Sequence, residues 1–119
     1  MKIALRKTLL LLLTLAPLVL GIFASLLLCN PVLAEQSNRG AKIFSNNCTA
    51  CHGGGGNIIL GEKNLHKQAL LKYHIHSIKA IAHQVKHGKK AMPAFKGRLS
   101  DRQIETVARY VLKQAEKGW

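Results

Sequence analysis

Acidic and aromatic residues are both scarce in this chain of 119 residues. It contains 5 Asp and Glu against 18 Lys and Arg, and Phe, Trp and Tyr make up only 5% of it. Without a set of aromatic residues for stacking on bases, and without a nucleic-acid-binding motif, the basic composition alone does not indicate a nucleic-acid partner. Neither an alternating strand pattern nor an internal repeat is present. These absences exclude β-sheet and repeat architectures and favour an all-α fold.

The one long hydrophobic run lies at the N-terminus, where residues 1–34 have the layout of a secretory signal peptide. Basic residues (Lys2, Arg6 and Lys7) precede an almost wholly apolar stretch over residues 9–28, and Asn30-Pro31 then breaks the helix. The apolar run is long enough to span a bilayer, so an uncleaved anchor is the alternative. The helix breaker and the cleavage-like tripeptide that ends at Ala34 favour cleavage after Ala34 and export.

Residues 35–119 would then form one small domain. A domain of about 80 residues has little room for a purely hydrophobic core, so we expect a bound apolar group to form part of the core. Removal of the three basic leader residues leaves 15 basic residues against 5 acidic ones, a formal charge of +10. This charge favours acidic partners or anionic membranes through salt-sensitive attraction.

The central motif is Cys48-Thr49-Ala50-Cys51-His52, which reads C-x-x-C-H, the attachment motif of c-type haem. Two thiols at this spacing can form thioethers to the two haem vinyl groups, and the adjacent imidazole is placed to bind the iron. The sequence therefore predicts one covalent haem c at Cys48 and Cys51, with His52 as an iron ligand.

Three alternative roles for the cysteine pair remain open. A redox-active disulfide pair usually lies in a βαβ context, which the sequence lacks. A structural zinc site usually needs two spaced pairs of Cys or His ligands, and only one pair is present. A structural disulfide would leave His52 unexplained.

Four glycines, residues 53–56, follow the motif. They lack the Lys-Ser/Thr ending of a phosphate-binding loop, which argues against a nucleotide site. Because glycines do not sustain a helix, we expect a loop here.

A second chemical stretch contains Met92, followed by Pro93 in an irregular segment. Haem iron bound by His on one side can take a Met thioether on the other, which raises the reduction potential. Met92 lies 40 positions after His52, far enough for the chain to wrap around the ring. We therefore predict Met92 as the second axial ligand; its alternative role is that of a core side chain.

Four helices are expected. The first covers residues 39–47 after polar capping residues at 36–38, and its Gly40 would allow close approach of Tyr110 on the last helix. The second follows Asn64 as its cap, the third runs from Ser77 to a stop at Gly88, and the fourth begins at Ser100 or Asp101 with Gln103 in its first turn. Each is supported by apolar residues at helical spacing.

Five histidines are scattered between the two ligand stretches, at positions 66, 74, 76, 83 and 87. Each by itself is expected to be a solvated or hydrogen-bonded side chain. An additional metal site formed by two of them is the alternative.

These residues resemble the cytochrome c6 family, the electron carriers of cyanobacterial and algal thylakoid lumens. The likeness runs from about Arg39 to Trp119. It is carried by Gly40-Ala41-Lys42-Ile43-Phe44, the C-x-x-C-H motif, Ala91-Met92-Pro93-Ala94-Phe95, Gly97-Arg98-Leu99-Ser100 and the ending from Tyr110 to Trp119.

The resemblance implies a small class I cytochrome c fold, with about four helices around one covalent haem. It implies a soluble, monomeric electron carrier and not an enzyme, which takes electrons from cytochrome f of the cytochrome b6f complex and passes them to photosystem I. Delivery to a terminal oxidase, in the lumen or the periplasm, is the alternative.

The resemblance also implies roles for residues beyond the iron ligands. Asn57, Lys63 and Gln84 match positions near the haem propionates or ring edge, where a polar Gln would tune the potential. Lys96 and Arg98 resemble the basic docking site for photosystem I; the alternative for both is a solvated loop.

The chain departs from the family in three respects. Lys90 stands where relatives commonly have Gly, and Gly56 where many have Asn; we expect neither to touch an iron ligand. The strong positive charge is also unusual, and it favours an acidic docking face.

Two other classes of function compete with electron transfer: a haem enzyme or gas sensor assisted by His83 or His87, and a basic protein that binds nucleic acid or membrane.

Overall fold

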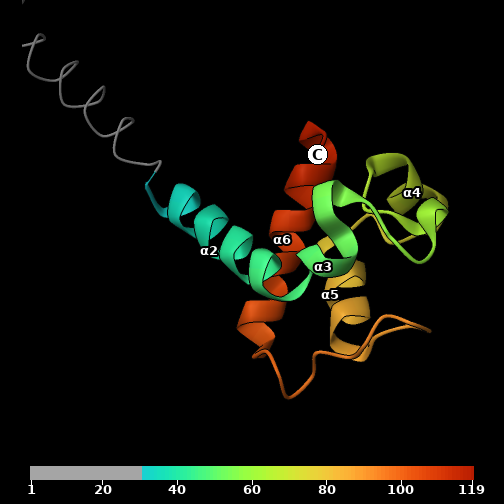
Figure 1. Ribbon diagram of the computed structural model, residues 1–119. Helices are drawn as coiled ribbons and strands as arrows, with labels where there is room; N and C mark the ends of the chain where they lie inside the picture. The colour runs from blue at the N-terminus through green and yellow to red at the C-terminus, as the bar shows by residue number, and fades with distance from the viewer. Residues whose placement is uncertain (1–30) are drawn as a thin grey trace, which may run out of the picture. The chain divides into compact units, whose positions relative to one another are not determined.

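Helices α5 (Ile78–His87) and α6 (Asp101–Lys117) pack directly against each other (Figure 1). The structure, a computed structural model, describes residues 31–119, with side chains from Glu35 onward. The predicted signal peptide thus lies outside the described residues, except for its last four. Residues Glu35–Trp119 form one unit.

Five α-helices lie in the described part of the chain. Four of them are longer than one turn, and the elements in order are α2 (Pro31–Asn47), α3 (Thr49–His52), 3-10 turns at Gly53–Gly55 and Gly61–Lys63, α4 (Lys67–Lys72), α5 and α6. Between residues 31 and 119 there is no strand, only two isolated bridges, which confirms the all-α prediction. No helix in this part of the chain has the length and hydropathy of a membrane span.

The core is built around the apolar stripe of α6. Ile104, Val107, Ala108 and Val111 are buried there, as the helical spacing predicts. Leu70 of α4, Ile81 and Val85 of α5, Phe44 of α2 and Phe95 pack in the same cluster. Every described helix longer than one turn thus contributes to one core.

The caps of α5 and α6 follow the sequence rules. Ser77 accepts a hydrogen bond from the Ala80 amide at 3.1 Å, and Gly88 ends α5 with a φ of +68°. Ser100 and Gln103 form a reciprocal capping box at the start of α6. Both caps are therefore confirmed. Each depends only on residues a few positions apart, which is why the sequence alone indicates them.

Two local predictions are wrong. Helix α2 already begins at Pro31, a residue suited to a first turn, so the expected caps at 36–38 lie inside it. Helix α4 has His66 as its N-cap, and the Asn64 side chain instead accepts from the His66 amide at 3.0 Å. The glycine run does not sustain a helix, as expected: it forms one short 3-10 turn in which Gly54 and Gly55 have positive φ.

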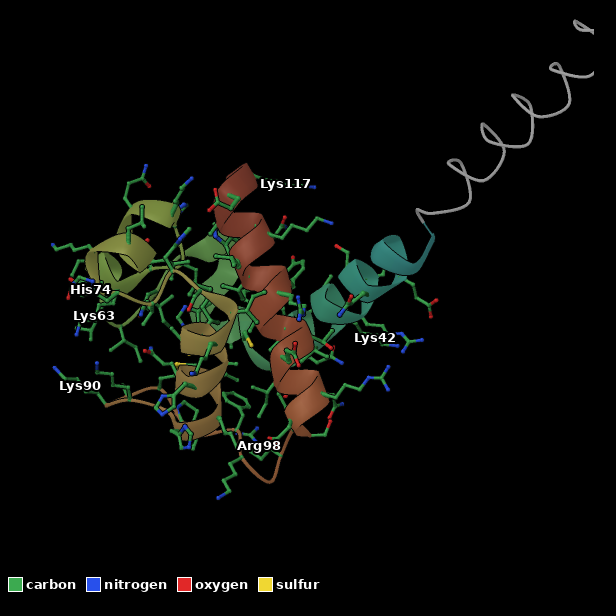
Figure 2. The ribbon with its side chains drawn as sticks, turned by 180° about the vertical axis from the view of Figure 1, so that it is seen from behind. Lys42, Lys63, His74, Lys90, Arg98 and Lys117 are labelled. Carbon is green, nitrogen blue, oxygen red and sulfur yellow. The ribbon has the colours of Figure 1, made fainter. Side chains whose placement is uncertain are left out.

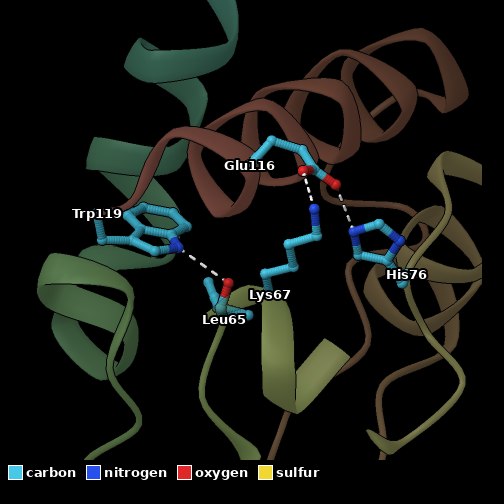
Figure 3. Close-up of polar contacts among 5 residues, drawn as sticks. All are labelled: Leu65, Lys67, His76, Glu116 and Trp119. Carbon is cyan, nitrogen blue, oxygen red and sulfur yellow. Dashed lines mark hydrogen bonds and ion pairs between the residues drawn. The ribbon is translucent and has the colours of Figure 1, made fainter. Parts of the chain in front are cut away.

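The C-terminal end of α6 is tied to the α4 region by a small polar cluster (Figure 3). Glu116 Oε2 accepts from Lys67 Nζ at 2.6 Å, and His76 Nε2 lies 2.7 Å from Glu116 Oε1. The Lys67 hydrogen bond holds the pKa of the Glu116 carboxyl below its usual value. Trp119 Nε1 donates to the Leu65 carbonyl at 2.9 Å, which anchors the end of the chain.

Helices α2 and α6 cross at Gly40, as the sequence predicts. A Cβ at Gly40 would lie 2.6 Å from the Cβ of Tyr110 and 3.0 Å from the Thr106 carbonyl. The Phe44 ring, one turn later, lies 5.4 Å from the Tyr110 ring, measured between centroids. The two backbones can approach this closely only because residue 40 has no side chain.

We therefore expect Gly40→Ala to lower the free energy of unfolding. Overpacking costs about 1–3 kcal/mol, whereas the change from glycine to alanine gains only about 1 kcal/mol in helix propensity. The net loss of stability should lower the midpoint of thermal unfolding by several degrees. Gly61→Ala is the control, because a Cβ there meets nothing within 4 Å. Equal unfolding midpoints for the two variants would contradict the close crossing.

Candidate haem site

All five described helices contribute to one cleft. It is lined by Phe44 of α2, Cys51 and His52 of α3, Leu70 of α4, Ile81, Gln84 and Val85 of α5, and Val107 and Val111 of α6, together with Cys48, Ile59, Leu60, Leu65, Tyr73, Ile75, Met92, Pro93 and Phe95. Most of these side chains are apolar. The cleft therefore suits a large hydrophobic ligand that carries a few polar groups.

The single turn of α3 brings the two cysteines and His52 together. The amides of Cys51 and His52 donate to the Cys48 carbonyl at 3.1 and 2.8 Å, and both cysteines are free. Burial, and secondly the neighbouring Cys51, raises the pKa of the Cys48 thiol to about 11. A redox-active C-x-x-C pair needs the opposite, a lowered pKa, so the Cys48 thiol does not match that alternative.

A zinc site also finds no support in the described residues. Between residues 31 and 119, no group of three or more His, Cys, Asp or Glu side chains is placed to hold a metal ion. Structural zinc needs four such ligands. The cysteine pair therefore lacks the companions that this alternative requires.

His52 is oriented by the backbone of the glycine turn. Its Nδ1 lies 2.8 Å from the Gly56 carbonyl oxygen, and the Gly56 amide donates to the Gly53 carbonyl at 3.0 Å. Since a carbonyl can only accept, Nδ1 carries the proton and Nε2 keeps its lone pair. This pattern fixes the tautomer and ring plane of metal-binding histidines.

The segment that contains Met92 is fastened to the end of α5. Lys89 and Met92 exchange two backbone hydrogen bonds of 3.0 Å each. The Phe95 amide donates to the Val85 carbonyl at 3.0 Å, and the Lys96 amide donates to the Lys86 carbonyl at 3.1 Å. The Met92 side chain is thereby placed on the cleft, with the Gln84 amide 3.8 Å from its sulfur.

Gly88 allows this segment to fold back. A Cβ there would lie 2.5 Å from the Met92 carbonyl oxygen and 2.7 Å from the Ala94 amide nitrogen, and its φ is +68°. Lys90 also has a positive φ, +53°. Glycine adopts this region without strain, which would explain the glycine that the family resemblance implies at that position.

The predicted peripheral residues all line the cleft. Asn57 also organises its own loop: it accepts from the amides of Ile59 and Leu60 at 3.0 and 2.9 Å and donates to the Lys63 carbonyl at 2.9 Å. The Lys63 ammonium lies 5.3 Å from the centre of the Tyr73 ring. Gln84 is the residue that reaches the Met92 sulfur.

Lys96 and Arg98, the predicted docking residues, do not line the cleft. Both are exposed in the segment between α5 and α6, and the Arg98 guanidinium lies 4.9 Å from the centre of the Phe95 ring. Figure 2 shows Lys63 and Lys90 along one edge of the molecule and Arg98 further along its surface. Their role as docking residues stays a prediction.

The expectation that Gly56 does not touch an iron ligand is wrong, and the contact of Gly88 with the Met92 segment is not indicated by the sequence. Gly56 does touch the expected iron ligand, through its carbonyl and not through a side chain. Because that contact is made by the backbone, no residue type signals it. The sequence indicates Gly88 only as a helix stop, yet this glycine also makes room for the Met92 segment.

The residues of the cleft fit a covalent haem. The cleft has apolar walls from α2, α4, α5 and α6, two free thiols in one turn, an imidazole with a free Nε2 and a thioether sulfur. Haem c offers the matching groups: an apolar ring, two vinyl positions and an iron that binds nitrogen and sulfur.

Comparisons with known proteins agree with this geometry. A family model described as "Cytochrome C oxidase, cbb3-type, subunit III" matches residues 35–111. Cytochrome c6 of Thermosynechococcus vestitus is 58% identical over 87 residues, 73% of this chain and 78% of its own length. Cytochrome c6 of Synechococcus elongatus is 60% identical over 86 residues, 72% of this chain and 98% of its own length.

Among solved structures, cytochrome c6 from the diatom Phaeodactylum tricornutum superposes with a TM-score of 0.68 at 53% identity. The match covers 70% of this chain and 98% of the diatom protein. The family model establishes a c-type cytochrome domain, and the identities and coverage single out one family within that class. The chain belongs to the cytochrome c6 family: it carries a covalent haem c with its iron and acts as an electron carrier, not as an enzyme.

Proposed function

We propose that this protein is a soluble one-electron carrier that takes electrons from cytochrome f and delivers them to photosystem I, with His52 and Met92 as the axial ligands of its iron. The observation that carries this proposal is the cleft itself. A nitrogen atom with a free lone pair and a thioether sulfur both lie on it, each held by main-chain hydrogen bonds.

The two ligands explain why the site suits electron transfer. Bound haem supplies a one-electron Fe(III)/Fe(II) couple. His52 and Met92 are both neutral donors, and a Met ligand raises the potential. Bound to the iron together, they would leave no open position for oxygen or peroxide. The Gln84 amide beside the Met92 sulfur adds polarity at a point where it can tune the potential.

Localisation follows from the same proposal. Cleavage after Ala34 would release residues 35–119 into the thylakoid lumen, with the periplasm as the alternative compartment. Haem c is attached on the far side of an energy-transducing membrane, which agrees with an exported chain. The charge of +10 on the released domain supports partners with acidic docking faces.

Delivery to a terminal oxidase is the second candidate. The observation that favours it is the match of residues 35–111 to a family model whose description names an oxidase subunit. A direct comparison of rates distinguishes the two functions. Photosystem I reduction after a flash and oxygen uptake by an oxidase can be followed with the same reduced protein, and we expect the photosystem reaction to be the faster one.

The ligand assignment is tested by a redox titration followed by visible spectroscopy. We expect sharp reduced bands, the weak red-region band of Met-ligated ferric haem and a clearly positive midpoint potential in the wild type. Met92→Leu keeps the volume but removes the sulfur. The variant should lose the red band, show a lower midpoint potential and bind carbon monoxide at full occupancy when reduced.

The control for Met92→Leu is Leu60→Ala, which changes the lining of the same cleft but removes no ligand atom. It should keep the red band and exclude carbon monoxide. Full carbon monoxide binding by the reduced wild type would mean that Met92 is not a ligand, and the proposal for photosystem I would fall with it.

The fold-back at Gly88 gives a second prediction. Gly88→Ala should push the Met92 segment away from α5, because its Cβ would meet the Met92 carbonyl at 2.5 Å. We expect the red band to weaken and to disappear at a lower temperature than in the wild type.

Gly97→Ala is the matched control. Gly97 also has a positive φ, +84°, but a Cβ there meets nothing within 4 Å. Both variants therefore carry a backbone cost of about 1–3 kcal/mol for a positive φ, and Gly88→Ala adds the collision with the Met92 segment. Identical behaviour of the red band in the two variants would show that the contact with Met92 is unimportant.

The docking role of Arg98 and Lys96 gives a third prediction. Arg98→Gln and Lys96→Gln should each slow the second-order reaction with photosystem I severalfold at low salt, and the effect should shrink as salt screens the attraction. Lys42→Gln removes the same charge from α2, at a separate part of the surface (Figure 2), and should have little effect. An unchanged red band confirms an intact site in each variant, and equal rates for all three variants would reject the docking role.

A further inference from the structure

Two histidines on α5 form a pair that the haem site does not use. His83 and His87 are both exposed, and their ring centroids lie 4.2 Å apart at an interplanar angle of 34°. Residues four positions apart lie on the same side of a helix. The inner side of α5 is occupied by Ile81 and Val85, which are buried in the core. The two imidazoles thus form a cluster of their own on the outer side.

A backbone contact prepares one of these rings for a metal ion. His87 Nδ1 lies 2.8 Å from the His83 carbonyl oxygen, so Nδ1–H donates and Nε2 keeps its lone pair. This is the same arrangement that His52 makes with Gly56 at the haem site. Since both rings are exposed, modest rotation of the His83 side chain can bring its own nitrogen toward the same ion.

We propose that His83 and His87 form a surface binding site for one divalent transition-metal ion, with water completing the coordination. Two histidines four positions apart on a helix is the spacing that zinc-binding helices use. Imidazole suits Cu²⁺, Ni²⁺ and Zn²⁺, and affinity rises toward Cu²⁺. Mg²⁺ and Ca²⁺ require oxygen ligands and are not expected to bind.

The charges around the pair also bear on which metal ions it can bind. The domain carries a formal charge of +10, so electrostatic attraction does not gather cations on it. Lys86, on the same helix, is already paired with Asp101 at 2.7 Å. Binding must therefore come from chelation by two neutral imidazoles, which selects ions that prefer nitrogen donors.

A bound ion would bridge the last turns of α5. Those turns provide the carbonyls of Val85 and Lys86, to which the segment after Met92 is fastened. An ion that binds the folded chain and not the unfolded one raises the unfolding midpoint. The site would thus stabilise the helix end next to the haem cleft, whichever partner the carrier serves.

The test uses the ferric holoprotein without an affinity tag. Equilibrium dialysis with Ni²⁺, and separately with Zn²⁺, should show one ion bound per chain, whereas Mg²⁺ at the same concentration should show none. His83→Gln and His87→Gln should each weaken binding about tenfold or more and abolish the metal-induced rise in the unfolding midpoint. His66→Gln, which removes an exposed histidine elsewhere, should bind as the wild type does.

The substituted residues are exposed and lie outside the haem cleft, so the visible spectrum and the metal-free unfolding midpoint should not change. The absence of saturable Ni²⁺ or Zn²⁺ uptake by the wild type would overturn the proposal. Uptake that survives both His83→Gln and His87→Gln would overturn it as well, because the ion would then sit elsewhere. Neither result bears on electron transfer, which the red band and the potential test independently.

Discussion

Main-chain hydrogen bonds hold both expected iron ligands on one apolar cleft, although the residues are 40 positions apart. The Gly56 carbonyl sets the tautomer of His52, and the backbone bonds from the end of α5 to residues 95 and 96 hold the Met92 segment. Such bonds do not depend on flexible side chains, so the fold itself holds the atoms that are expected to bind the iron. A rigid site of this kind limits the rearrangement that accompanies a change of iron charge.

The chain has few aromatic residues, but three of them lie together in one cluster. Phe44, Tyr110 and Trp119 come from α2, α6 and the C-terminus, and their ring centroids are 5.2 to 6.2 Å apart. They meet beside the Gly40 crossing, while Phe95 and Tyr73 border the cleft. A domain of this size thus has one aromatic cluster that joins its first and last helices, and the haem site supplies the rest of the apolar interior.

Positive charge surrounds this framework without entering the core, where none of the described residues is a buried polar or charged one. Lys63, Lys89 and Lys90 border the cleft, and Arg98 lies on the segment between α5 and α6. The charge therefore acts on partners and on long-range attraction, and the fold itself rests on apolar packing, caps and close helix crossings. The His83–His87 pair is a separate feature of the same surface. It would bind a metal ion through its imidazole nitrogens and not through electrostatic attraction.

The sequence by itself determined the features that depend on neighbouring residues: the C-x-x-C-H turn, the caps at Ser77 and Ser100, the apolar stripe of α6 and the close crossing at Gly40. Each is visible because residue type and short spacing decide the local geometry. The tertiary structure alone decided the contact of Gly56 with His52, the space that Gly88 leaves for the Met92 segment and the exposure of the His83–His87 pair. The glycine contacts run through backbone atoms, which carry no residue-specific signal, and the exposure of the two histidines depends on which helix face remains uncovered after the core has formed.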